Sequence, residues 1–335
     1  MGGSGRNKRP RRGSLGYSPR KRASKIVPTL NSWPEVDDVK ILDFPGYKVG
    51  MSHILRIDDR KYTLTKGKEM VVPVTLVETP PVYVCGVRAY KKTTYGLKTV
   101  TECWAEGPKE LSRSKTVPKN PVKDLSKIQS LIESGKVDDL RAIVCTQPKL
   151  INLKKKPEVM ESGIGGADVN AKLEYLIGVF GKELKVRDVL DEGEFVDVIS
   201  VTKGKGFQGV IKRWGVKVQT RKSNDARRHV GSIGPWHPPK VMWTVPFAGQ
   251  MGFHTRTELN KRIFRITNPK DLNITPKEGF KNYGLVTSDY AMLKGSVGGS
   301  TKRILRLRKS IRVPVRRTGG VPDITYLYKA SAGEA

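Results

Sequence analysis

Cysteine and histidine are scarce in this sequence. The cysteines Cys85, Cys103 and Cys145 are an odd number at wide spacing with no paired ligand motif, so we expect reduced thiols in a cytosolic protein. The four histidines lack the close spacing of a zinc site. Neither a histidine next to a carboxylate nor a serine elbow such as G-x-S-x-G is present. The sequence therefore predicts no metal site, no cofactor site and no catalytic residue.

Long apolar runs are absent as well. No stretch approaches the roughly eighteen apolar residues that a membrane helix needs, and no apolar segment follows the basic start. Acidic residues are few, because 32 Asp and Glu stand against 63 Lys and Arg, which gives a net charge of +31. A compact surface with this charge repels itself unless a polyanion neutralises it. The sequence therefore predicts a phosphate-rich partner and argues against secretion and membrane spanning.

The positive charge is concentrated in three windows, 1–25, 203–229 and 302–317. Together they hold 26 basic residues and a single acid, Asp225, so they carry +25 of the +31. The rest of the chain is nearly balanced. This pattern indicates a globular body with basic appendages, which suits deep contacts with RNA better than a membrane surface.

Short β-rich runs separated by turn residues dominate the chain outside these windows. Several strands at this spacing predict a β-barrel, into which helices and a basic segment, 203–265, are inserted. The arm 1–25 has too few apolar groups to fold alone and is expected to order against a partner. The expected strands are 47–51, 71–77, 82–90, 99–104, 195–201, 290–297 and 302–307, and the expected helices are 121–135 and 170–180.

A glycine-rich loop at 204–209 formally matches the dinucleotide motif G-x-G-x-x-G. Its context argues against a cofactor, because 210–215 is not expected to begin an amphipathic helix and Asp225 does not end a strand. We interpret it as a flexible loop in which glycines let the backbone and Lys203, Lys205 and Lys212 approach phosphates.

Aromatic residues and prolines alternate with cations at 234–246. Trp214 and Trp236 fit either buried packing or nucleotide stacking, and packing is the commoner outcome for a single tryptophan. Trp243 is different, because prolines bound its segment and it is predicted to project from a loop tip. The charge run 256–262 fits either a solvated helical turn or phosphate binding, and its place after the basic loop favours RNA.

Several motifs resemble those of one known family along nearly the whole chain. They are RRGSLG at 11–16, PRKR at 19–22, FPGYKVGM at 44–51, VETPP at 77–81, VTKGKG at 201–206, RWG at 213–215, GFH at 252–254 and RTELNK at 256–261. Together they resemble the large-subunit ribosomal protein L-three family in its archaeal type. The end of the chain at Ala335, without the longer tail of eukaryotic members, also points to an archaeal source. Only the stretch 223–230 matches the family loosely.

The resemblance implies a mainly β fold with inserted helices, in which a translation-protein-type β-barrel carries long basic extensions. The implied division is 1–35 as the basic N-terminal extension, 36–110 as the first part of the barrel, 111–190 as a helix-containing insertion, 191–202 as a barrel strand, 203–265 as a central finger entering rRNA, and 266–335 as the last barrel strands and C-terminal tail.

The resemblance also implies a function. It predicts a non-enzymatic ribonucleoprotein component of the cytoplasmic large ribosomal subunit, which binds rRNA, contacts neighbouring ribosomal proteins, acts early in subunit assembly and reaches toward the peptidyl-transferase centre. Trp243 matches the finger tip, although some archaeal relatives lack this residue, and His237 matches a position methylated in eukaryotic relatives. No membrane or small-molecule partner is expected. The predicted RNA-binding residues are Arg6, Lys8, Arg9, Arg11, Arg12, Arg20, Lys21, Arg22, Lys203, Lys205, Lys212, Arg213, Trp214, Lys217, Arg221, Lys222, Arg227, Arg228, Trp236, His237, Lys240, Trp243, His254, Arg256, Lys261 and Arg262.

Two other functions stay open at this point. One is a nucleotide-dependent RNA-modifying enzyme that uses the glycine loop, and it depends only on the formal motif. The other is a non-ribosomal protein that compacts nucleic acid, which the total charge allows but the loop of Trp, Gly and Pro disfavours.

Overall fold

The computed structural model describes residues 11–60, 62–116, 118, 121, 125–223, 226–313 and 320–328. The chain forms two compact units, which we call the basic unit and the body. The basic unit comprises Met1–Ser24 and Thr202–Thr255, and the body comprises Lys25–Val201 and Arg256–Ala335. By sequence the basic unit holds 18 basic residues and one acid, a net charge of +17. Fewer than a quarter of the residues thus carry more than half of the net charge.

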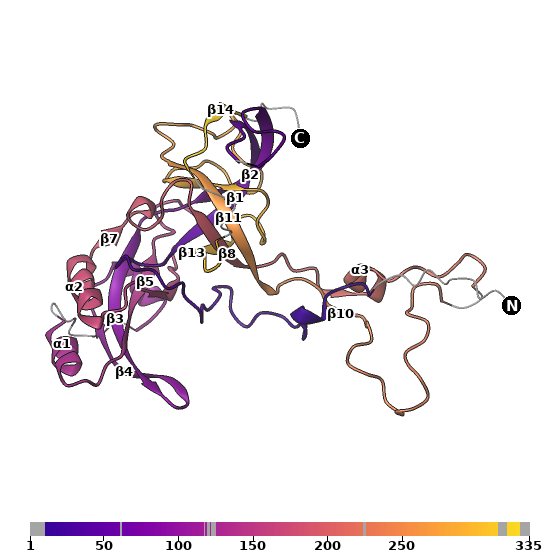
Figure 1. The fold of residues 1–335 in the computed structure, drawn as a ribbon, viewed down its shortest axis with the longest axis horizontal. Helices are drawn as coiled ribbons and strands as arrows, with labels where there is room; N and C mark the ends of the chain where they lie inside the picture. Colours follow the sequence, from indigo (N-terminus) through magenta and orange to yellow (C-terminus); the bar gives the residue numbers. More distant parts are fainter. Residues whose placement is uncertain are drawn as a thin grey trace. The chain divides into compact units, whose positions relative to one another are not determined.

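A ring-like β-sheet forms one part of the body (Figure 1). Its strands run in the order β13-β8-β11-β12-β2-β1, and β13 also pairs with β1, so that six strands of the described chain close on themselves; β14 pairs with β1 beside the ring. The predicted mainly β fold is confirmed. The bounds are β1 (Asp43–Ile57), β2 (Glu69–Glu78), β8 (Phe195–Val201), β11 (Thr255–Thr267), β12 (Tyr290–Lys294), β13 (Ile304–Lys309) and β14 (Ile324–Leu327).

A second sheet in the body has the strand order β4-β3-β5-β6, with β7 paired to β3. The predicted division assigns 36–110 to the barrel, yet β3 and β4 pair here rather than in the ring. One cluster of buried apolar side chains joins the two sheets and includes Val77 and Ile304 of the ring and Val84 and Leu140 of the second sheet. A separate cluster within the ring includes Phe264. The bounds are β3 (Val82–Thr93), β4 (Gly96–Trp104), β5 (Asp139–Thr146), β6 (Val159–Gly163) and β7 (Glu183–Leu184).

Two helices, α1 (Ser126–Glu133) and α2 (Val169–Val179), contact each other beside this sheet, and α2 packs on β5 (Figure 1). Both confirm predicted helices, although α1 begins five residues after the predicted start at 121. The Asp168 carboxylate caps α2 by accepting the Asn170 N–H at 3.1 Å. Short 3₁₀ helices lie at η2 (Lys109–Arg113) and η3 (Val186–Asp188).

The charge window 302–317 is not simply an appendage, and that interpretation is wrong for Ile304–Lys309. These residues form β13, in which every residue is buried. Arg306 donates to the Asp43 carboxylate at 2.8 and 2.6 Å, and Arg308 donates to the Asp197 carboxylate at 2.7 Å. Because the acids lie far away in the sequence, a count of local charge treats these arginines as unpaired. Residues 314–319 of this window lie outside the described residues.

Candidate nucleic-acid interface

Trp214 is the centre of the basic unit. It ends α3 (Val210–Trp214), is 8% exposed, and its indole N–H donates to the Phe247 carbonyl at 3.0 Å. The guanidinium carbon of Arg20 lies 3.7 Å from the centroid of the Trp214 ring, within the range of a cation–π contact. Arg20 also donates to the Arg213 carbonyl at 2.8 Å. The tryptophan thus fixes a cation of the N-terminal arm against the inserted segment.

The described part of the arm, 11–24, has partners within the basic unit. Ala23 donates its N–H to the Phe253 carbonyl at 2.8 Å, and a ring nitrogen of His254 lies 2.9 Å from the Lys21 carbonyl oxygen. Gly13 has φ +74°, and a Cβ there would lie 2.5 Å from the Trp214 ring, so a larger residue would clash. The arm was expected to order against an outside partner, and here it packs on its own chain. It contains the 3₁₀ helix η1 (Leu15–Tyr17).

Arg213 holds the two sides of the inserted segment together. Its guanidinium donates to the Gln250 carbonyl at 3.0 Å and to the Phe247 carbonyl at 2.7 Å. Burial lowers the pKa of Arg213 below its usual value, but an arginine remains charged at neutral pH. Nearby, β9 (Phe207–Gln208) pairs with β10 (Gly249–Gln250). The sequence predicted that Arg213 binds a phosphate. In the structure its guanidinium instead donates hydrogen bonds to backbone carbonyls.

The glycine-rich loop precedes a short helix, α3, although 210–215 was not expected to begin an amphipathic helix. α3 has five residues and ends at Gly215, whose φ of +69° is the left-handed conformation that ends many helices. Gly252 allows a close approach to this loop, because a Cβ there would lie 2.1 Å from the Lys203 carbonyl oxygen. One turn of helix is too short to form the helix of a dinucleotide-binding βαβ unit.

Three further predicted RNA ligands are buried: Trp214, His254 and Arg262. Arg262 belongs to β11 of the body, is 5% exposed, and donates to the Asp59 carboxylate at 3.0 Å and to the Gly320 carbonyl at 2.6 Å. Arg20, Arg213, Arg256 and Lys261 are half-buried. The charge run 256–262 lies within the strand β11 and is not the helical turn considered from sequence.

The remaining described candidates are exposed. Between Gly215 and Gly249 the described residues form no helix or strand, and Trp236 and Trp243 are 87% and 72% exposed there. The exposed candidates are Arg11, Arg12, Lys21, Arg22, Lys203, Lys205, Lys212, Lys217, Arg221, Lys222, Arg227, Arg228, Trp236, His237, Lys240 and Trp243. Arg6, Lys8 and Arg9 lie outside the described residues.

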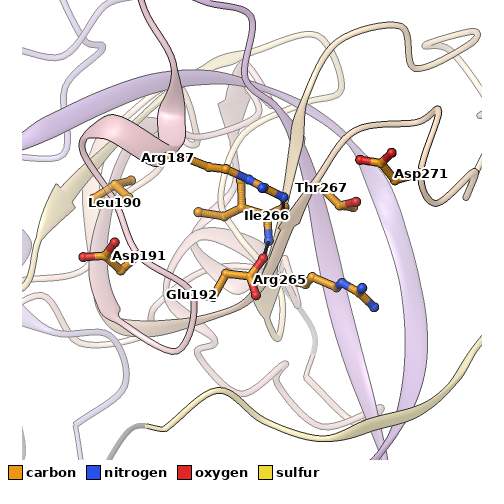
Figure 2. Close-up of a pocket in the computed structure, with 8 residues that line it drawn as sticks. All are labelled: Arg187, Leu190, Asp191, Glu192, Arg265, Ile266, Thr267 and Asp271. Atoms are coloured by element: carbon orange, nitrogen blue, oxygen red, sulfur yellow. Dashed lines mark hydrogen bonds between the residues drawn. The ribbon is translucent and has the colours of Figure 1, made fainter.

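A surface cavity of about 440 Å³ lies in the body between the segment after η3 and the end of β11 (Figure 2). Arg187 donates to the Ile266 carbonyl at 2.7 Å, and the Glu192 carboxylate accepts the Ile266 N–H at 2.9 Å. The lining contains no histidine, cysteine or serine. Its charged groups hold the end of a strand and form no arrangement for acid–base or nucleophilic chemistry. Over the described ranges, no group of three or more His, Cys, Asp or Glu is placed to hold a metal, and no helix has the length and apolar character to cross a membrane.

Comparison with known proteins decides between the functions left open by the sequence. The family model described as Ribosomal protein L3 matches residues 4–331. The chain belongs to the ribosomal protein L3 family. It is 50% identical to the large ribosomal subunit protein uL3 of Methanopyrus kandleri, over 99% of this chain and 94% of the relative. It is 48% identical to uL3 of Methanobrevibacter smithii, over 96% and 97%, and 49% identical to uL3 of Archaeoglobus fulgidus, over 96% and 98%.

Membership of the ribosomal protein L3 family makes this chain a large-subunit ribosomal protein with a structural part in translation, located in the ribosome in the cytoplasm, and not an enzyme. The resemblance to the archaeal type is confirmed, because these relatives are archaeal. Neither the RNA-modifying enzyme nor the non-ribosomal compacting protein is consistent with this family.

Proposed function

We propose that the chain binds large-subunit rRNA directly, mainly through the basic unit. The observation that carries this proposal is the combination of charge and exposure in that unit. It has 18 basic residues and one acid, and most of its described cations are exposed. Basic side chains that find no carboxylate within their own unit need another source of negative charge, and RNA phosphates supply it at high density.

The cations of the basic unit fall into two classes by their contacts. Arg20 and Arg213 bind the aromatic ring and the carbonyls that shape the unit. Lysines and arginines on the outside, such as Lys205 and Arg227, are exposed. The first class builds a scaffold, and the second class meets phosphates. Arginines there can grip a phosphate with a planar fork, whereas lysines act as mobile point charges.

The salt dependence of binding to isolated large-subunit rRNA tests this proposal. If about ten phosphates are neutralised, the log–log slope of affinity against salt is expected to be about −7 to −9. Replacing Arg221, Lys222, Arg227 and Arg228 by alanine should make the slope shallower by about 3. Each cation that no longer neutralises a phosphate leaves the counterions of that phosphate in place.

The matched control replaces four exposed lysines of the body, Lys66, Lys155, Lys156 and Lys281, by alanine. It makes the same change in net charge outside the basic unit, and the slope should change much less. A wild-type slope near about −2 would contradict extensive phosphate contact.

We further propose that the loop between Gly215 and Gly249 is a finger that reaches toward the peptidyl-transferase centre, with Trp243 at its tip. Trp243 is 72% exposed, and its neighbours Val241 and Met242 are also exposed. Exposed apolar groups on a cationic loop suit insertion between nucleotides, where a ring stacks on a base. Through this finger and the arm, the protein would support subunit assembly at an early stage.

Replacing Trp243 by alanine is expected to leave large-subunit yield near normal, because no packing within the protein is lost. Translational fidelity, or sensitivity to drugs that bind the peptidyl-transferase centre, should change. The control is Trp236→Ala, which removes another exposed tryptophan of the same loop. If cells with Trp243→Ala match the wild type in both assays, the proposed role of the tip is wrong.

A further inference from the structure

The hairpin of β3 and β4 extends beyond its sheet. β5 pairs with β3 only as far as Tyr90, whereas β3 and β4 continue to pair up to Thr93 and Gly96. Residues 91–98 therefore form a two-stranded ribbon, whose tip projects from the sheet in Figure 1. Every residue of this ribbon is exposed. A two-stranded ribbon gains little stability by itself, so its exposed residues depend on the sheet at its base or on a partner for their stability.

The ribbon brings like charges together. Lys91 and Lys98 lie directly opposite each other on the paired strands. Directly opposite residues have Cβ atoms about 4.5–5.5 Å apart, and like charges at such positions are destabilising. No described residue forms an ion pair with either lysine or with Lys92. An anion between the two ammonium groups would turn this repulsion into attraction.

The acids around the ribbon are already engaged at its base. Glu102, the first acid after the turn, pairs with Arg88, and the Asp138 carboxylate accepts the Lys92 backbone N–H at 2.6 Å. From position 91 to 101 the sequence has three lysines and no acid. The ribbon therefore presents positive charge with no internal counter-charge.

An aromatic ring stands at the turn of the ribbon. Tyr95 is fully exposed, and Leu97 beside it is 43% exposed. A protein partner would be expected to offer carboxylates to the lysines and an apolar pocket to the ring. A nucleic acid offers phosphates and flat bases from a single strand, and base stacking on an aromatic ring needs no pocket.

We propose that this ribbon is a second RNA-binding element, in which Lys91 and Lys98 share one backbone phosphate and Tyr95 stacks on an unpaired base of rRNA. The inference rests on the proposed function, since it requires that the chain binds rRNA. It places a contact in the body, outside the arm and the finger. None of the three residues was among the candidates predicted from sequence.

The first test compares charge variants in rRNA binding. Lys91→Ala with Lys98→Ala is expected to reduce the salt slope of the full-length protein by about 0.7 to 0.9, because the two lysines share one phosphate. The control, Lys155→Ala with Lys156→Ala, removes two adjacent exposed lysines of the body and should leave the slope unchanged. Tyr95→Ala should weaken binding about 5-fold or more, through loss of stacking.

A single variant separates RNA binding from a structural role. Lys98→Glu places opposite charges across the ribbon, so the free protein should unfold at the same or a higher denaturant concentration. Its affinity for rRNA should nevertheless fall below that of Lys98→Ala. If stability and affinity both fall in Lys98→Glu while Lys98→Ala binds like the wild type, the lysine acts in folding and the proposal is overturned.

The second test uses intact large subunits. After ultraviolet cross-linking and digestion, mass spectrometry should find a nucleotide attached to the peptide that contains Tyr95. A cross-link from this peptide to another ribosomal protein, or no nucleotide adduct, would overturn the ribbon proposal. A shallow salt slope of the wild-type protein would instead overturn the proposed function, so the two failures are distinguishable.

Discussion

Replacing Asp43 by alanine is expected to lower the free energy of unfolding of the protein by about 3–5 kcal/mol, because it leaves a buried arginine without its counter-charge. Arg306 is 2% exposed and donates to the Asp43 carboxylate through two nitrogens. Its other acceptors are the backbone carbonyls of Pro28 and Glu161, which carry no net charge. Denaturant unfolding of the full-length variant measures the loss.

The control for Asp43→Ala is Glu110→Ala, which removes the partner of Lys149. That lysine is 65% exposed, and exposed ion pairs contribute little to stability because water screens them. The expected order is therefore a large loss for Asp43→Ala and a small one for Glu110→Ala. Similar losses in the two variants would show that the contribution of the Arg306–Asp43 pair to the free energy of unfolding does not depend on its burial.

Replacing Trp214 by alanine is expected to lower the local stability of the basic unit by about 3–5 kcal/mol, the usual loss for a buried tryptophan. The change removes the ring on which Arg20 packs and the donor to the Phe247 carbonyl. Exchange of the Ala23 amide, which donates to the Phe253 carbonyl, should become roughly a hundredfold faster or more as the arm detaches. Denaturant unfolding of the body should change little.

Trp236→Ala is the matched control, because Trp236 is 87% exposed and its loss should change stability by no more than about 0.5 kcal/mol. Hydrogen exchange of the Ala23 amide should then be the same as in the wild type. If the Ala23 amide stays protected in Trp214→Ala, Trp214 does not hold the arm, and the scaffold that we assign to Arg20 and Arg213 needs another anchor.

Strands and helices of the body were readable from local pattern. β8 was predicted over 195–201 and is observed as Phe195–Val201, where every residue is buried. α2 was predicted over 170–180 and is observed as Val169–Val179. Not every apolar residue of α2 is buried, since Ile177 is 55% exposed although Leu173 and Leu176 are buried. A repeat of apolar residues gives the element, but the neighbours in space decide how wide its buried face is.

The pairing of the strands was harder to predict from the sequence than the strands themselves. β3 and β4 follow β2 in the chain and have the same texture, so they were assigned to the barrel. They pair with each other instead, and β3 pairs with β5, which begins more than thirty residues after β4 ends. Alternation of apolar residues predicts a strand and its buried side. It does not identify the strand with which it pairs, because all residues form the same backbone hydrogen bonds.

The sequence by itself determined that the net charge is large and clustered, that the body is mainly β, and, through its motifs, the family to which the chain belongs. Only the tertiary structure decided which cations are available to a partner. Arg306 and Arg308 are neutralised by buried aspartates, Arg20 and Arg213 are engaged with a ring and with carbonyls, and Lys91 and Lys98 are left facing each other. The physical reason is that electrostatic energy depends on distance and burial in space, and the partners of these side chains come from distant parts of the chain or from the opposite strand of a hairpin.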